Sequence, residues 1–133
     1  MTDKERTEKA LKSKAQRAYR TALSVVNSDT NSAANRAYYC LYQAIVAELE
    51  RPEQIDAGAA RAFKDDEKLK FTHSFVRNNA RLAGLDGRQS RIVSVAYQFR
   101  TEADYSESEL FPQDIIDLLN GIAEILECLG VNV

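Results

Sequence analysis

The sequence contains no tryptophan, and only two prolines and five glycines occur in its 133 residues. Because proline and glycine most often interrupt regular structure, their scarcity favours long helices joined by few turns. No apolar stretch approaches the roughly 20 residues that a membrane-spanning helix needs, so we expect no membrane partner. The first residues also lack the apolar core of a secretory signal peptide. These absences predict a cytoplasmic protein.

Residue patterns that hold metals or cofactors are also missing. Cys40 and Cys128 form no C-x-x-C pair, which excludes zinc-finger spacing. We expect both cysteines to be small buried hydrophobes in a reducing compartment. Glu48, Glu50 and Glu53 have no Glu-x-x-His pair beside them, which disfavours a di-iron bundle. Without a Gly-rich phosphate loop or an H-E-x-x-H pair, the sequence predicts no metal and no cofactor.

Charge is distributed unevenly along the chain, although the formal net charge is only −2. Residues 1–20 carry seven basic and three acidic side chains. Residues 101–133 carry eight acidic side chains and neither lysine nor arginine. Such an asymmetry can steer a polyanion towards one end of the molecule. A solvated helix face would explain the same pattern, and the sequence leaves both interpretations open.

Apolar residues recur at steps of three and four along most of the chain, which is the period of an amphipathic helix. No alternating pattern persists long enough to indicate a sheet, and no linker separates two domains. We therefore predict one all-α domain over residues 1–133, an up-and-down bundle of four to five helices. The predicted helices cover 4–26, 33–50, 68–83, 88–105 and 112–129, with a less regular helical segment over 55–63.

Two stretches place an arginine among aromatic residues inside an otherwise apolar helical pattern. They are Asn35-Arg36-Ala37-Tyr38-Tyr39-Cys40-Leu41-Tyr42 and Arg100-Thr101-Glu102-Ala103-Asp104-Tyr105. A charged group that is buried alone costs too much free energy, so each arginine must be paired or must face a cleft. Arg36 and Arg100 are therefore the first candidates for a functional site.

The first of these stretches resembles the second-helix signature of the HEPN superfamily (higher eukaryote and prokaryote nucleotide-binding). In that signature a polar residue and an arginine precede a tyrosine pair. The second stretch resembles the R-x-x-A-D-Y element of the small single-domain prokaryotic branch. The resemblance implies a helical homodimer that binds RNA or a nucleotide in a toxin–antitoxin or phage-defence setting. It also implies a protein partner, either a cognate antitoxin or a nucleotidyltransferase.

The sequence departs from the catalytic signature of the nuclease members of this superfamily. That signature is an arginine followed four to six residues later by a histidine, whereas here Tyr105 stands five residues after Arg100. The only histidine, His73, follows no arginine at that spacing. Metal-independent RNA cleavage needs a base, an acid and a cation, and tyrosine with a pKa of about 10 suits the first two roles poorly. The site could therefore bind without cleaving.

We expect Arg36 and Arg100 to contact phosphate, which arginine binds in a bidentate manner. Asp104 would orient Arg100, because residues four apart share one helix face. The neighbouring Asn35 and Tyr39 belong to the same predicted phosphate-binding set. The plainer interpretation is that Arg100 and Asp104 form a structural ion pair.

A second group could supply catalytic or binding side chains from other positions. His73 and Tyr105 are the candidate acid and base beside Arg100, and Arg77 lies one turn after His73 on the same face. Alternatively, His73 could cap or hydrogen-bond a neighbouring helix. Tyr38, Tyr39 and Tyr42 fit the core or a dimer seam better than a base-stacking platform.

Three functions remain open from the sequence alone. The first is binding of RNA or a nucleotide without turnover. The second is a divergent metal-independent ribonuclease that uses Arg100 with His73 or Tyr105. The third is a non-catalytic dimeric scaffold for a partner such as a nucleotidyltransferase.

Overall fold

The computed structural model describes residues 2–50, 64–65, 70–105, 107 and 109–133. Within these ranges the chain forms five α-helices, one short 3-10 helix and one pair of two-residue strands. The predicted all-α bundle is confirmed. The elements follow in the order α1 (Asp3–Val25), α2 (Thr30–Leu49), β1 (Lys64–Asp65), β2 (Lys70–Phe71), α4 (His73–Asn78), η2 (Ala80–Ala83), α5 (Gly87–Tyr105) and α6 (Pro112–Cys128).

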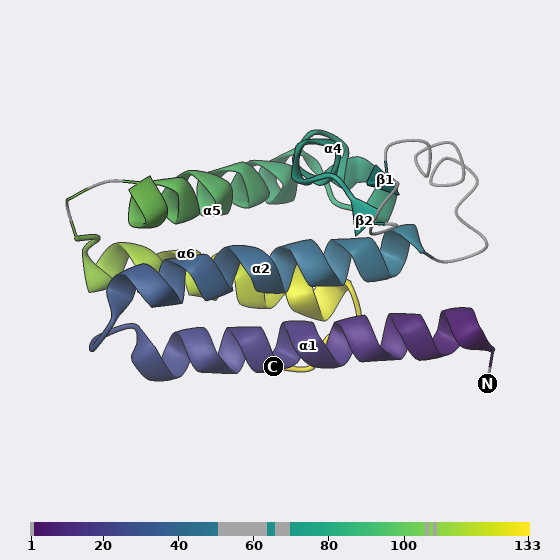
Figure 1. The fold of residues 1–133 in the computed structure, drawn as a ribbon, viewed down its shortest axis with the longest axis horizontal. Coiled ribbons are helices and arrows are strands. Elements are labelled where there is room, and N and C mark those ends of the chain that lie inside the picture. Colours follow the sequence, from purple (N-terminus) through teal and green to yellow (C-terminus); the bar gives the residue numbers. More distant parts are fainter. Residues whose placement is uncertain (1, 51–63, 66–69, 106, 108) are drawn as a thin grey trace.

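The central helix of the bundle is α2. It lies between α1 and α5 and also contacts α6, and it runs antiparallel to α1 (Figure 1). A helix that is surrounded in this way must be apolar over most of its circumference. Accordingly, α2 buries 12 of its 20 residues, and five of those 12 are alanines. The small side chains let α1, α5 and α6 approach closely and place the polar residues of α2 at defined gaps between helices.

Side-chain caps fix where the first two helices begin. The Thr2 hydroxyl accepts a hydrogen bond of 3.1 Å from the backbone N–H of Glu5. The Asp29 carboxylate accepts one of 3.2 Å from the backbone N–H of Ser32. Each bond satisfies an N–H group that has no partner within the helix. The predicted helices over 4–26 and 33–50 are confirmed, and Asp29 makes the second begin three residues earlier, at Thr30.

The predicted continuous helix over 68–83 is wrong where the structure describes it. Phe71 pairs with Lys64 in the short antiparallel ladder and is almost completely buried. Thr72 then has an extended backbone, and its hydroxyl caps α4 by accepting from the Phe75 N–H at 3.1 Å. Asn79 ends α4, and its side-chain amide donates to the Phe75 carbonyl at 3.1 Å. Polar side chains thus compete with the backbone at both ends and reduce the helix to six residues.

The last two helices agree with the sequence pattern. Pro112 occupies the first turn of α6, where its missing N–H has no cost. Gly130 ends the same helix region with a φ of +77°, a conformation that favours glycine. The loop before α6 is held by the Asn31 side chain, which accepts from the Leu110 N–H at 3.1 Å. The predicted helices over 88–105 and 112–129 are therefore confirmed, whereas the segment over 55–63 lies outside the described residues.

The two cysteines differ, contrary to the prediction that both are buried. Cys40 is fully buried in α2, and its thiol donates to the carbonyl of Ala37 at 3.0 Å. Cys128 is exposed at the end of α6, because it lies on the outer side of that amphipathic helix. Among the described helices, none combines the length and the apolar character that crossing a bilayer requires.

Candidate functional site

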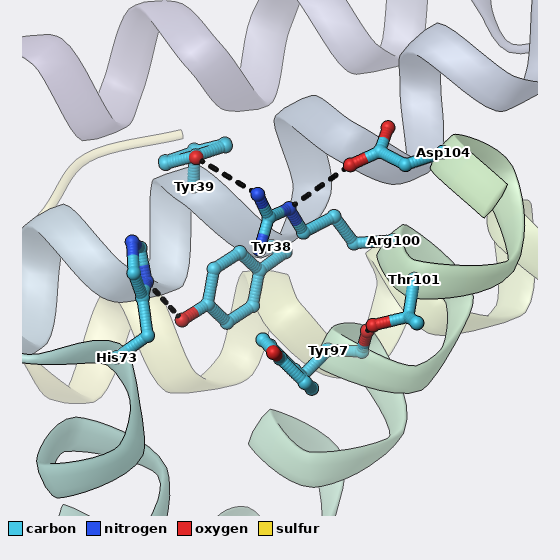
Figure 2. A network of polar contacts seen from close by, with 7 residues as sticks. All are labelled: Tyr38, Tyr39, His73, Tyr97, Arg100, Thr101 and Asp104. Atoms are coloured by element: carbon cyan, nitrogen blue, oxygen red, sulfur yellow. Dashed lines mark hydrogen bonds and ion pairs between the residues drawn. The ribbon is translucent and has the colours of Figure 1, made fainter.

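Arg100 on α5 points towards the tyrosines of α2 and is the centre of a polar network (Figure 2). Its side chain is only 20% exposed. One terminal nitrogen donates to the Tyr39 hydroxyl at 3.3 Å, and Nε lies 3.4 Å from a carboxylate oxygen of Asp104. The spacing of four residues on α5 brings Arg100 and Asp104 to one face, as the sequence predicted. The carboxylate thereby fixes the direction of the guanidinium.

Aromatic rings surround the same guanidinium on its other sides. Its carbon lies 5.6 Å from the ring centroid of Tyr38, 5.3 Å from that of Tyr39 and 5.8 Å from that of Tyr97. A cation within about 6 Å of an aromatic face is attracted by the ring quadrupole. These contacts offset part of the desolvation of Arg100 without using its N–H groups. A guanidinium has five N–H donors, and among the described residues its one hydrogen bond, to Tyr39, uses a single terminal N–H, while the buried Nε faces Asp104 without an aligned hydrogen bond. The capacity to bind a ligand therefore lies in the terminal nitrogens.

His73 reaches the same cluster from the start of α4. Its Nδ1 lies 2.7 Å from the Tyr38 hydroxyl (Figure 2). Its ring centroid lies 4.5 Å from that of Tyr42. Tyr42 in turn donates to the backbone carbonyl of Phe71, which holds the strand before α4 against α2. Tyr38 thus contacts His73 through its hydroxyl and Arg100 through its aromatic ring.

Burial controls the protonation of this tyrosine pair. Burial, followed by the neighbouring Tyr42, raises the pKa of the Tyr38 hydroxyl well above its ordinary value, although Arg100 and Arg77 act in the opposite direction. Burial is also the main cause of the raised pKa of Tyr42. Both hydroxyls are therefore neutral at physiological pH. A neutral Tyr38 hydroxyl can either donate to Nδ1 of His73 or accept from it, according to the imidazole tautomer.

Arg77 contacts the cluster through the ring of Tyr97. Its guanidinium carbon lies 3.9 Å from the Tyr97 ring centroid, a stacked cation–π contact. Its Nε is buried and has no hydrogen-bond partner within the described part of the chain. Tyr97 therefore contacts two arginines, Arg77 on α4 and Arg100 on α5. The sequence alone did not single out Tyr97, although its position three residues before Arg100 could have indicated it.

Arg36 lies on a different side of α2 and is exposed. It lines a groove of about 460 Å³ between α1 and α2, together with Asn35 and Tyr39. It also borders a hollow of about 250 Å³ that includes Asp104. Within the described ranges, Arg36 makes no ion pair. Tyr39 links the two regions, because its side chain lines the groove and its hydroxyl accepts from Arg100.

The structure thus brings together most of the predicted site. Arg100, Asp104, Tyr39 and His73 contact one another through Tyr38 and its neighbours, and Arg77 joins through Tyr97. The residues that border the adjoining hollows are Asn35 and Arg36. Tyr105 is 84% exposed at the end of α5, and no contact of its side chain joins it to this cluster in the described residues.

The sequence pattern did not single out two basic residues of the groove as candidate site residues. Lys14 and Arg17 lie on the groove side of α1, facing Arg36 across the gap. Their spacing of three residues was the available signal, since it places both on one helix face. Many other basic residues share the first helix, so only the packing against α2 distinguishes these two.

Comparisons with models of known protein families, with curated proteins and with solved structures found no match to the chain. The family resemblance is therefore carried by the two sequence stretches around Arg36 and Arg100. Among the described residues, no group of three or more His, Cys, Asp or Glu side chains is placed to hold a metal ion.

Proposed function

We propose that the protein is a HEPN-like module that binds RNA or a nucleotide through its phosphate groups. The observation that carries this proposal is the environment of Arg100. Its guanidinium is oriented by Asp104 and Tyr39 and is flanked by aromatic rings, and its one hydrogen bond among the described residues uses a single terminal N–H. A preorganised arginine loses little conformational entropy when it binds a phosphate in a bidentate manner. Arg36 supplies a second, exposed cation in the hollow that Asp104 also borders.

The biological setting follows from the resemblance to the HEPN superfamily. We propose a role in a toxin–antitoxin or phage-defence system, with an antitoxin or a nucleotidyltransferase as the protein partner. The unpaired state of both cysteines suits the reducing cytoplasm as the place of action.

Binding can be tested by fluorescence anisotropy with a labelled ATP analogue and a labelled short single-stranded RNA. Arg100→Lys keeps the positive charge but removes the bidentate geometry, and Arg36→Ala removes the exposed cation. We expect each to weaken binding by about tenfold, the usual loss for a charge-assisted hydrogen bond. Arg81→Lys is the control, because Arg81 is exposed on η2 and lines neither hollow that Arg36 borders. Equal affinity of all four proteins for both probes would reject the proposal.

A second candidate function, metal-independent RNA cleavage, is favoured by one specific contact. His73 and Arg100 both contact the side chain of Tyr38. Nδ1 of His73 lies 2.7 Å from the Tyr38 hydroxyl, and the guanidinium carbon of Arg100 lies 5.6 Å from the Tyr38 ring centroid. A histidine and an arginine on one substrate phosphodiester could act as acid–base group and charge stabiliser. In this arrangement the histidine comes from another helix and precedes the arginine in the chain.

Cleavage is tested by incubating RNA in EDTA with the wild-type protein, Arg100→Ala and His73→Gln, with folding checked by circular dichroism. A ribonuclease predicts wild-type cleavage that both variants lose, with a pH profile that contains a group near neutrality. If the clean wild-type protein leaves RNA intact, this second function is wrong, and the binding function is unaffected.

We also propose that the protein is a homodimer, and one surface supports a symmetric interface. A groove of about 330 Å³ runs between α5 and α6, which lie antiparallel. Arg88 and Arg91 lie at the α5 start and Asp114 and Asp117 at the α6 start, so opposite charges occupy opposite ends. In a two-fold arrangement each basic end would meet the partner's acidic end. The floor between these ends is formed by Ile92, Val95, Phe99 and Leu118.

Light scattering coupled to size-exclusion chromatography tests this dimer. Arg91→Asp and Asp117→Arg should each weaken the dimer by placing like charges together, and an equimolar mixture of the two should restore it. A wild-type monomer across micromolar concentrations would contradict the dimer. A dimer that neither variant weakens would place the interface elsewhere.

A further inference from the structure

The groove between α1 and α2 is long enough to hold a short stretch of one nucleic-acid strand. Because the two helices are antiparallel, Lys14 lies near Gln43 at one end, and Thr21 lies near Asn35 at the other. The seven helical steps from Lys14 to Thr21 span about 10 Å at a rise of about 1.5 Å per residue. A stacked nucleic-acid strand advances about 3.4 Å per nucleotide, so the groove has room for about three nucleotides.

Positive charge in this groove is uncompensated. Lys14, Arg17 and Arg36 are exposed, and none of them pairs with a carboxylate in the residues that the structure describes. The neighbouring hollow at the other end of α1 differs in this respect. There Lys12 lies 3.0 Å from Glu8 and 3.5 Å from Glu48, so its charge is already neutralised. The contrast on one helix singles out the α1–α2 groove as the place where an anion would gain most.

One group in the groove does not suit an anion that only accepts hydrogen bonds. The side-chain oxygen of Gln43 is buried and has no hydrogen-bond partner among the described residues. A buried oxygen without a donor is unfavourable, and a donor on the ligand would satisfy it. Phosphate oxygens cannot donate, but a ribose 2′-hydroxyl can. The combination of free cations and an unsatisfied acceptor therefore fits a ligand that carries phosphates and hydroxyl groups alternately.

We propose that this groove binds successive phosphates of single-stranded RNA, with Lys14, Arg17 and Arg36 contacting the backbone and Gln43 accepting from a ribose hydroxyl. The inference rests on the proposed function and names its ligand class: an oligoribonucleotide, held along α1, rather than a mononucleotide held at Arg100 alone. The half-buried ring of Tyr39 also lines the groove, where it could contact a base of the strand.

The test compares three probes on the same proteins by fluorescence anisotropy: a labelled short RNA, the DNA of the same sequence and a labelled ATP analogue. The double variant Lys14→Ala/Arg17→Ala removes the α1 cations. Its matched control is Arg6→Ala/Lys9→Ala, which removes two positive charges from the exposed surface of the same helix. Gln43→Met keeps the side-chain length and removes the amide oxygen. Circular dichroism checks that each variant is folded.

We expect the Lys14/Arg17 double variant to bind RNA at least about tenfold more weakly and to keep its affinity for the ATP analogue. The slope of log affinity against log salt should fall by about 1.4, because each phosphate contact on a single strand contributes about 0.7. The control double variant should change neither quantity by as much. Gln43→Met should remove the preference for RNA over DNA while leaving DNA binding unchanged.

The outcomes separate this inference from the proposed function. If Arg100→Lys weakens binding of the ATP analogue but the Lys14/Arg17 variant binds RNA like the wild type, the groove assignment is wrong and the proposed function stands. If wild-type protein binds none of the three probes, both are wrong. A preference for RNA that survives in Gln43→Met refutes the role of Gln43. Equal binding of labelled poly-glutamate, with the same dependence on Lys14 and Arg17, would replace RNA by an acidic polypeptide as the ligand.

Discussion

Two sides of α2 hold positive charge in opposite environments. On the side facing α4 and α5, Arg100 and Arg77 are packed against tyrosines, and Arg100 has a carboxylate partner. On the side facing α1, Lys14, Arg17 and Arg36 are exposed beside a groove without such partners in the described chain. The first arrangement fixes a cation in place, whereas the second leaves cations available. A site that must both orient and attract a polyanion needs both kinds.

The difference has an energetic meaning. A cation held by aromatic faces and a carboxylate contributes to the fold, so its removal should destabilise the protein. An exposed cation without a partner contributes little to the fold, so its removal should affect ligand binding far more than stability. Variants that separate stability from binding therefore test the comparison directly.

The largest expected effect is on the buried side, at the tyrosine that connects His73 with Arg100. Tyr38 has no exposed surface. Tyr38→Ala should lower the free energy of unfolding by about 3–5 kcal/mol, because it leaves a cavity and removes the face on which Arg100 lies. Urea denaturation followed by circular dichroism measures the change. The matched variant on the exposed side, Lys14→Ala, should lie within about 0.5 kcal/mol of the wild type.

The second effect contrasts the two arginines with the same substitution. Arg100→Met should lower the free energy of unfolding by about 1–2 kcal/mol, since it removes the cation–π contacts and the bond to Tyr39 while keeping much of the side-chain volume. Arg36→Met should change it by less than about 0.5 kcal/mol. Equal changes in parallel urea titrations would mean that the two environments do not differ as described.

A smaller effect concerns the hydroxyl of Tyr38. Tyr38→Phe keeps the ring and loses the hydrogen bond to His73, which should cost about 1 kcal/mol at neutral pH. Because burial raises the pKa of Tyr38 above the ordinary value of 10.0, the folded state holds this proton more tightly than the unfolded state. The stability that this tightly held proton contributes is fully present below pH 10.0, and it is lost as the pH rises from there towards the pKa of Tyr38 in the folded state. Urea titrations at neutral and at alkaline pH should show a smaller alkaline loss in Tyr38→Phe, and an unchanged loss would contradict the assignment.

The smallest expected effect is a gain on the exposed side. Lys14 and Arg17 are like charges three residues apart on α1, and such pairs destabilise a helix slightly. Arg17→Gln should therefore raise the free energy of unfolding by about 0.2–0.5 kcal/mol at low ionic strength. The gain should vanish in high salt, where the repulsion is screened. A loss of stability in low salt would show that Arg17 has a structural role on this face.

Several parts of the molecule could be predicted from local sequence. The long helices follow from apolar periodicity, and Pro112 and Gly130 mark the two ends of α6 through the rigid ring of one and the positive φ of the other. The contact between Arg100 and Asp104 follows from their spacing on one helix. The region around α4 could not be predicted in this way. Thr72 and Asn79 decide its ends through side-chain hydrogen bonds that compete with a helical pattern of otherwise ordinary strength.

By itself, the sequence determined the helical class, the main helix positions and the two stretches that carry the arginines, because these depend on periodicity and on residues close together in the chain. Only the tertiary structure decided that His73 meets Tyr38, that Tyr97 contacts both Arg77 and Arg100, and that Lys14 and Arg17 face Arg36 across a groove. The physical reason is that these contacts join different helices. Their rotation and depth are set by how the small side chains of α2 let its neighbours pack, which no local pattern encodes.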